Sequence, residues 1–241
     1  MRTQTALSLL AVAALFALAG ANGPLAAQEK QKPVVKVPDA GVPQIGTIEG
    51  TFVRAAYNNE GYVILGYRAA NESVGEEWLK LDVGMTVRDK TPSYKLKRDH
   101  ISLSLPDNSK VPLPSIEEYR KANLAALQAR SRMIRDSINY FPPMASQACR
   151  IGFFSNNEGP MAWSEVELSN NRACVGELYF KVPGGIKLGQ YFLNVQFQNS
   201  LIRVPFRILT DEEEKMLEKN YKDIRQQVKD AFDPKKKGGG L

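Results

Sequence analysis

The amino-acid sequence predicts a mainly β protein: an antiparallel sandwich with one inserted amphipathic helix and a second helix near the C-terminus. Three observations support this prediction. Apolar and polar residues alternate along several short segments, which is the pattern of half-buried strands. The period changes to that of a helix over residues 115–138 and again over 210–232. Residues 189–209 hold two alternating segments around a short polar turn, which predicts a β-hairpin.

The predicted hairpin has one wholly apolar face. Placing a two-residue turn at Asn199 and Ser200 gives four apolar cross-strand pairs: Phe197–Ile202, Val195–Val204, Leu193–Phe206 and Tyr191–Ile208. Because side chains alternate with a period of two, a slip of one residue would move this apolar set into water. We therefore expect the hairpin to cover a β core.

Residues 1–21 have the features of an export signal. Arg2 precedes the apolar run 6–19, and Ala19-Gly20-Ala21 fits a signal-peptidase site. The run is short for a membrane span, although a retained signal anchor is the alternative. Ala21 stands where a lipoprotein signal needs its cysteine. We expect an exported protein, periplasmic or extracellular, that is not a lipoprotein and has no transmembrane segment after cleavage.

The next segment, 22–46, is rich in Pro, Gly, Lys and Gln and predicts an extended linker. The sandwich domain is expected over 47–209. Its predicted strands are 47–57, 62–71, 78–87, 94–105, 111–113, 149–154, 163–168, 174–182 and the hairpin. The clearest single strand is 78–87, where Leu79, Leu81 and Val83 share one face and Lys80 and Asp82 the other, which predicts a half-buried strand.

Two helices interrupt or end the strand pattern. Ser115 and Glu118 form a capping box at the start of a long amphipathic helix over 115–138. A second capping box, Thr210 to Glu213, begins a C-terminal amphipathic helix over 210–232, and a disordered basic tail follows over 233–241. The apolar stripe of the second helix is a candidate partner-binding surface made of Leu217, Tyr221, Ile224, Val228 and Phe232. The stripe either packs back on the sandwich or docks into another protein, and the sequence favours neither.

The two cysteines, Cys149 and Cys174, predict one disulfide. An even count in an exported chain favours a bond over two free thiols. Their spacing is not that of a C-x-x-C redox pair, so we expect a structural role.

The strand count and turn spacing suggest an immunoglobulin-like sandwich. The segments VILGYRAANES and ELYFKVPGG with GQYFLNVQF resemble strands of bacterial secreted immunoglobulin-like domains. The resemblance covers about two thirds of the mature chain at the level of pattern. It implies that the helix at 115–138 is inserted between two halves of a sandwich. Both cysteines lie in the second half, so the resemblance is to the architecture and implies no catalytic or binding residue.

The sequence contains no motif for a cofactor, a metal or a nucleic acid. The net charge of +6 is spread along the chain apart from Lys235-Lys236-Lys237, without the dense basic face of a nucleic-acid binder. The single histidine, His100, follows Asp99 and could serve a nucleophile only if a serine lay nearby. Adjacent glutamates such as Glu117 and Glu118 are explained by helix capping. We therefore predict no catalytic residue, no metal site and no cofactor.

Aromatic residues at strand ends offer a second kind of binding surface. The candidate ligand contacts are Trp78, Tyr57, Tyr62 and Trp163, whose rings could stack on a sugar. Trp78 lies opposite Leu79 and Leu81 by alternation and should point away from the main core, unless the inserted helix covers it.

These observations support the hypothesis of a non-catalytic exported binding or assembly module of the bacterial cell envelope, acting on an envelope protein partner. One alternative is a carbohydrate-binding module that takes a glycan on its aromatics. The other is an envelope hydrolase with carboxylates on separate strands.

Overall fold

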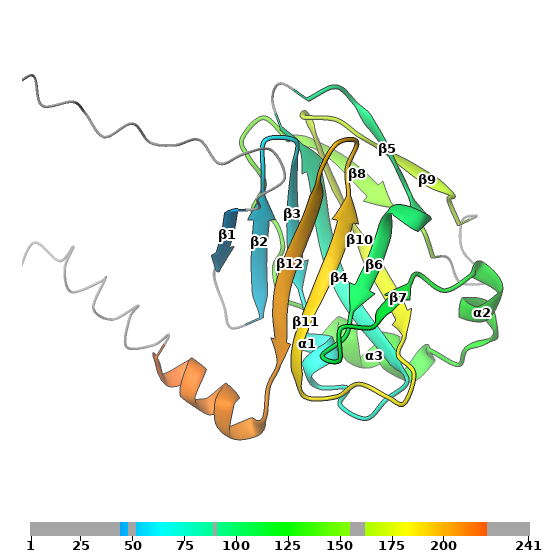
Figure 1. Ribbon diagram of the computed structural model, residues 1–241, viewed down its shortest axis with the longest axis vertical. Coiled ribbons are helices and arrows are strands. Elements are labelled where there is room, and N and C mark those ends of the chain that lie inside the picture. The colour runs from blue at the N-terminus through cyan, green and yellow to red at the C-terminus, as the bar shows by residue number, and fades with distance from the viewer. Residues whose placement is uncertain (1–43, 48–51, 89–90, 155–161, 221–241) are drawn as a thin grey trace, which may run out of the picture. The chain divides into compact units, whose positions relative to one another are not determined.

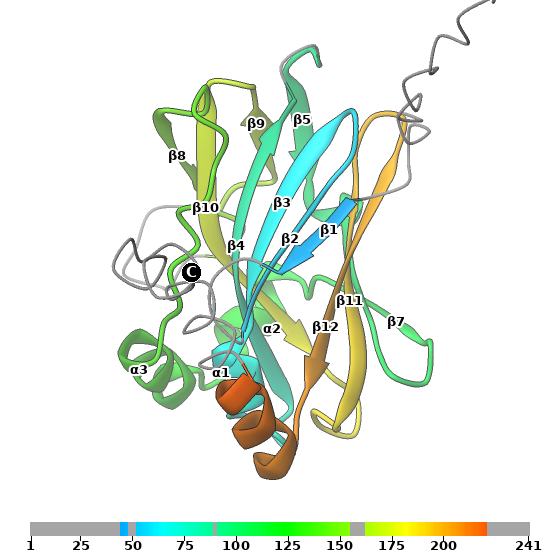
Figure 2. The ribbon, with the colours of Figure 1, turned by 90° about the vertical axis from the view of Figure 1, so that its left-hand side faces the viewer.

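The computed structural model describes residues 44–47, 52–88, 91–154 and 162–220. Within these ranges the chain forms twelve strands in three sheets and only short helices. Figures 1 and 2 show the larger sheets stacked in two layers. The predicted mainly β sandwich is therefore confirmed, while a specifically immunoglobulin-like strand arrangement stays a prediction.

The largest sheet has six strands in the order β1-β2-β3-β4-β10-β8. Their bounds are β1 Gln44–Thr47, β2 Val53–Tyr57, β3 Gly61–Gly66, β4 Trp78–Val87, β10 Arg172–Lys181 and β8 Gln147–Ile151. All neighbours are antiparallel except β8 and β10, which run parallel. The strand β1 thus begins inside the segment predicted to be a linker.

The second layer contains two smaller sheets. One has the order β12-β11-β6-β7, with β12 Leu201–Ile208, β11 Gly189–Gln196, β6 Ile101–Ser104 and β7 Lys110–Pro112. The other pairs β5 Tyr94–Lys97 with β9 Glu165–Leu168. The single turn η1, Arg98–His100, joins β5 to β6. The main core lies between the layers, where β4 residues such as Leu81 and Val83 and β11 residues such as Leu193 are fully buried.

The hairpin forms with its predicted apolar face but with a shifted turn. Leu193 pairs with Val204, and the N–H of Phe197 donates to the carbonyl of Ser200, so the turn residues are Gln198 and Asn199. The predicted turn at Asn199 and Ser200 is wrong by one position. Moving the turn by one residue moves the pairing by two, which keeps every side chain on its predicted face.

The strand β4 is buried on both faces, so its prediction as half-buried is wrong. Residues 134–141 cross the outer face of the large sheet, where Ile138 packs in a small second core and Phe141 lies against Gly84. A methyl group on Gly84 would lie 2.7 Å from the ring of Phe141. The absence of a side chain on Gly84 therefore lets this segment approach the sheet closely.

The inserted helix predicted over 115–138 is broken in two. Helix α2 spans Ile116–Lys121 and has the predicted Ser115–Glu118 capping box, and α3 spans Ala125–Met133. Ala122 between them has an extended backbone. In one continuous helix Asn123 would lie on the apolar stripe and Leu124 beside it, whereas the break buries Leu124 and leaves Asn123 exposed. The predicted strand 62–71 also ends early, at the short helix α1, Arg68–Asn71.

The predicted disulfide is present in the structure. Cys149 on β8 is directly opposite Cys174 on β10, and the two sulfur atoms are bonded. The bond ties the last strand of the large sheet to its only neighbour within the described residues. None of the described helices is long and apolar enough to cross a membrane.

Removing the disulfide is expected to destabilise the fold. The bond closes a loop with a sequence separation of 25, which corresponds to about 3.5 kcal/mol in the chain-entropy model. The double variant Cys149→Ala/Cys174→Ala should lower the free energy of unfolding by that amount in urea denaturation. Intact mass of the native protein should rise by two hydrogen atoms on reduction. An unchanged mass would show that the bond is not formed.

Candidate binding surfaces

The C-terminal helix is fixed at its base by its own capping box. The N–H of Glu213 donates to the Thr210 hydroxyl at 3.2 Å, and the N–H of Thr210 donates to the Glu213 carboxylate at 3.1 Å. Arg207 at the end of β12 also pairs with Glu213 at 2.8 Å, and its hydrogen bond lowers the pKa of that carboxyl. These contacts start the helix directly after the last strand.

A buried side chain from another part of the fold holds the same junction. The amide oxygen of Asn71, the last residue of α1, accepts the N–H of Leu209 at 2.7 Å. The amide nitrogen of Asn71 donates to the carboxylate of Glu214 at 3.3 Å. Since Asn71 is buried, it fixes both the end of the strand and the first turn of the helix.

Beyond this first turn the helix leaves the body of the protein. Residues 211–220 are helical, and in Figure 1 this helix extends sideways from the end of β12. The side chain of Met216 is 61% exposed and that of Leu217 is 39% exposed. Leu217, the first residue of the predicted stripe, is therefore only partly covered. Tyr221, Ile224, Val228 and Phe232 lie outside the described residues.

The aromatic candidates do not form one platform. Tyr57 and Tyr62 are cross-strand neighbours whose rings stack 5.8 Å apart, and the Arg88 guanidinium lies 5.4 Å from the Tyr57 ring centre. The Tyr62 hydroxyl donates to the carbonyl of Tyr140. Trp78 is the first residue of β4 and is half-buried against the core. It lies far from Tyr62, which pairs with Thr86 near the other end of the same strand. These three rings already have partners within the fold.

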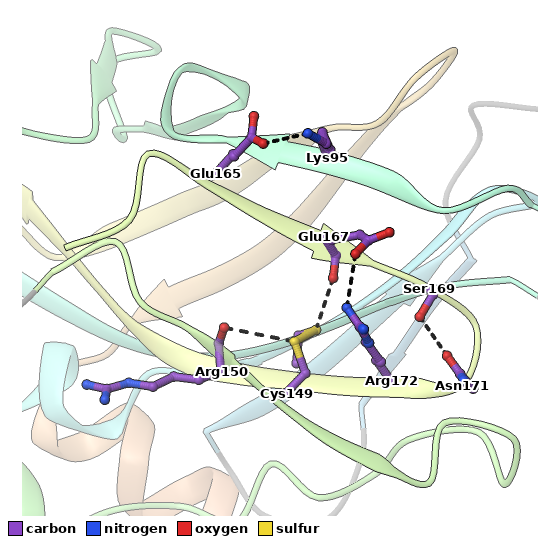
Figure 3. Close-up of polar contacts among 9 residues, drawn as sticks. Lys95, Cys149, Arg150, Glu165, Glu167, Ser169, Asn171 and Arg172 are labelled. Carbon is purple, nitrogen blue, oxygen red and sulfur yellow. Dashed lines mark hydrogen bonds and ion pairs between the residues drawn. A yellow bond between two sulfur atoms is a disulfide. The ribbon is translucent and has the colours of Figure 1, made fainter. Parts of the chain in front are cut away.

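Trp163 differs because it is exposed beside a groove. It lies just before β9, its side chain is 43% exposed, and it lines a shallow groove of about 500 Å³ between β8 and β9. The other lining residues are Gln147, Ala148, Cys149, Arg150, Glu165, Val166, Glu167 and Arg172. Figure 3 shows the disulfide next to the pair formed by Glu167 and Arg172, with the Arg150 side chain directed away from that pair.

A buried charge cluster, which the sequence reading did not single out, lies on the outer face of the large sheet. Lys80 is 1% exposed, and its ammonium group lies 3.1 Å from Asp82 and 3.2 Å from Glu177. Arg135 reaches Asp82 at 3.2 Å, and the Tyr179 hydroxyl donates to Glu177 at 2.8 Å. The alternation that places Lys80 and Asp82 on one face of β4 was visible in the sequence. Their burial was not, because distant segments decide it: Arg135 reaches Asp82, and Tyr119 of α2 packs on Tyr179, the cross-strand neighbour of Lys80.

The two carboxyls of this cluster have pKa values moved in opposite directions. Burial raises the pKa of Asp82 by more than Lys80 and Arg135 lower it. Burial also raises the pKa of Glu177, but Lys80 and the Tyr179 hydroxyl lower it further, so its pKa falls below the ordinary value. Such a separation is what a hydrolase would need. Here both carboxyls are engaged by Lys80, and we interpret the cluster as structural.

His100 is also engaged by neighbouring groups. Its Nδ1 atom lies 2.6 Å from the Tyr94 hydroxyl, and the two rings stack 5.7 Å apart. Its Nε2 atom lies 3.8 Å from Asp99, and no serine hydroxyl is bonded to it among the residues described. No group of three or more potential metal ligands occurs in the described part of the chain.

Comparison with protein-family models, with curated proteins and with solved structures gave no match.

Removing one member of the buried charge cluster should lower the free energy of unfolding. Lys80→Met leaves Asp82 buried with only Arg135 as an ionic partner, and removal of one partner of a buried pair typically destabilises by about 3–5 kcal/mol. The double variant Lys80→Met/Asp82→Leu leaves only the partly exposed Glu177 and Arg135, which water can solvate. We expect urea denaturation to show a smaller loss for the double variant than for the single one. A larger loss would contradict this account.

Proposed function

We propose that this chain is an exported, non-catalytic binding module of the bacterial cell envelope that docks a partner protein through its C-terminal helix. The observation that supports it is the combination of a fixed helix base with an exposed apolar side chain. Asn71 and Arg207 hold the first turn, whereas Leu217 one turn later is in contact with solvent. A helix anchored in this way presents its stripe in a defined direction, which reduces the ordering cost of binding.

The chemistry of the helix indicates the kind of partner. The apolar stripe continues in the sequence through Tyr221, Ile224, Val228 and Phe232, with spacings of three or four residues that suit a helix-in-groove contact. Residues 215–232 contain five basic and three acidic side chains. The partner we propose is therefore a protein with an apolar groove bordered by acidic residues.

The export part of the proposal rests on residues 1–21 and on the disulfide. A bond between Cys149 and Cys174 suits an oxidising compartment such as the periplasm. The immunoglobulin-like character of the sandwich belongs to the same proposal and is supported by the resemblance of its strand segments to bacterial secreted domains. Of the two alternatives, glycan binding is favoured at one place, Trp163, and the hydrolase has no comparable support.

The helix is tested by partner capture from envelope extracts. Residues 22–241 should retain a defined protein that residues 22–209 do not retain. Leu217→Gln/Ile224→Gln should lose that protein, because a polar amide replaces an apolar anchor at two stripe positions. Lys219→Arg, on the opposite side of the helix, preserves the charge, is the matched control and should keep it. Binding should then be reproduced with the purified partner by calorimetry.

Other outcomes would identify a different occupant of the apolar stripe. Concentration-dependent dimers in light scattering, lost in Leu217→Gln/Ile224→Gln, would identify a second copy of the chain as the occupant. Binding of the helix to anionic vesicles alone would identify a membrane surface. Equal capture by the stripe variant and by Lys219→Arg would exclude the stripe as the docking element.

Export predicts a processed N-terminus. If the signal is cleaved after Ala21, the protein recovered from a bacterial envelope fraction should begin at Asn22. N-terminal sequencing or top-down mass spectrometry measures this directly. A full-length chain in the cytoplasmic fraction would contradict the export part of the proposal.

A further inference from the structure

Trp163 lies flat on the protein with its outer side open. The N–H of Trp163 donates to the carbonyl of Gly152 at 2.7 Å, which places the residue beside the end of β8. A methyl group on Gly152 would lie 3.0 Å from Cδ2 and 3.1 Å from Cε3 of the indole. The ring therefore rests against a residue without a side chain, and 43% of Trp163 remains exposed. Among the described residues, no aromatic or cationic side chain stacks on it.

The groove next to this ring has a mixed polar and apolar lining, and its two carboxylates are paired with cations. Lys95 on β5 pairs with Glu165 at 2.8 Å, and Arg172 on β10 pairs with Glu167 at 3.2 Å (Figure 3). Gln147 on β8 lines the same groove with an exposed side chain. The charges of Glu165 and Glu167 are balanced by their ion-pair partners, and the four side chains of the two pairs stay between 39% and 68% exposed, so they are accessible to a ligand. The site therefore suits a ligand with many hydroxyl groups better than an ion.

An exposed indole beside ion-paired carboxylates and the amide of Gln147 is the chemistry that recognises a sugar ring. A pyranose with equatorial substituents has faces made only of C–H groups, which can cover an aromatic ring, while its hydroxyls point outward to polar side chains. We propose that the groove between β8 and β9 is a binding site for a β-linked oligosaccharide with equatorial hydroxyls, which stacks one sugar ring on Trp163 and hydrogen-bonds to Glu165, Glu167, Gln147 and Arg172.

The dimensions and lining of the groove fit this ligand. Its volume of about 500 Å³ falls within the roughly 300–1,000 Å³ of small-ligand sites. An extended peptide added to the edge of β8 that has no neighbouring strand among the described residues would need apolar pockets for alternate side chains. The aliphatic residues that line the groove are Val166 and Ala148. Val166 is only 3% exposed, so the groove does not offer the apolar pockets that a peptide would need. The site is separate from the C-terminal helix and does not depend on the proposed docking function.

The chain itself provides a reporter for this site. It contains two tryptophans, Trp78 and Trp163, so Trp78→Phe leaves Trp163 as the single indole. Titration of this variant with cellohexaose and with chitohexaose should change its fluorescence saturably and protect the indole from acrylamide quenching. Maltohexaose, whose α linkages curve the chain, should have a weaker effect at the same concentration.

Affinity measurements on the full chain complete the test. In calorimetry, Trp163→Ala should raise the Kd for the oligosaccharide at least tenfold, and Trp163→Phe should raise it less. The matched control Trp78→Phe should leave the Kd unchanged. Thermal unfolding and the intact disulfide mass should match the unmodified protein, which excludes a folding defect. Leu217→Gln should bind the sugar normally, so failure of the helix proposal would not affect this result. The inference is overturned if neither β-linked probe binds at millimolar concentration, or if Trp163→Ala binds as tightly as the native chain.

Discussion

The burial of β4 on both faces is the constraint on which the rest of the structure depends. The hairpin β11–β12 covers one face with a continuous apolar surface, and residues 134–141 cover part of the other. Burial on the second face encloses Lys80, whose charge must be matched there because water cannot reach it. Asp82 and Glu177 meet that requirement, and Arg135 joins the covering segment to the same cluster.

This arrangement leaves the proposed binding surfaces at the periphery of the sandwich. The groove beside Trp163 lies where the large sheet ends at β8 and the two-stranded sheet ends at β9. The C-terminal helix begins where β12 ends, and Asn71 ties its base to α1. Both surfaces are attached to strands that the core or the disulfide makes rigid. Rigid attachment is what positions an exposed aromatic or apolar side chain for recognition at low entropic cost.

Prediction from sequence succeeded where the signal was local and periodic. The capping boxes at Ser115 and Thr210 depend on residues three apart, and both form. Prediction failed where a distant segment decided the outcome. The helix expected to reach Ile138 ends at Met133, because Ile138 is needed on the outer face of the sheet instead. The aromatic candidates show the same contrast, since Trp78, Tyr57 and Tyr62 found partners within the fold and Trp163 alone lines the groove.

The sequence by itself determined which side chains of the hairpin face the core, because alternation with a period of two depends only on neighbouring residues. It did not determine the turn, since a shift of the pairing by two preserves the same face. Only the tertiary structure decided that Lys80 is buried and Leu217 exposed. Burial depends on which other segment arrives to cover a residue. Arg135 and Tyr119, from segments distant in the sequence, reach the side of the sheet that holds Lys80, whereas Leu217 remains 39% exposed.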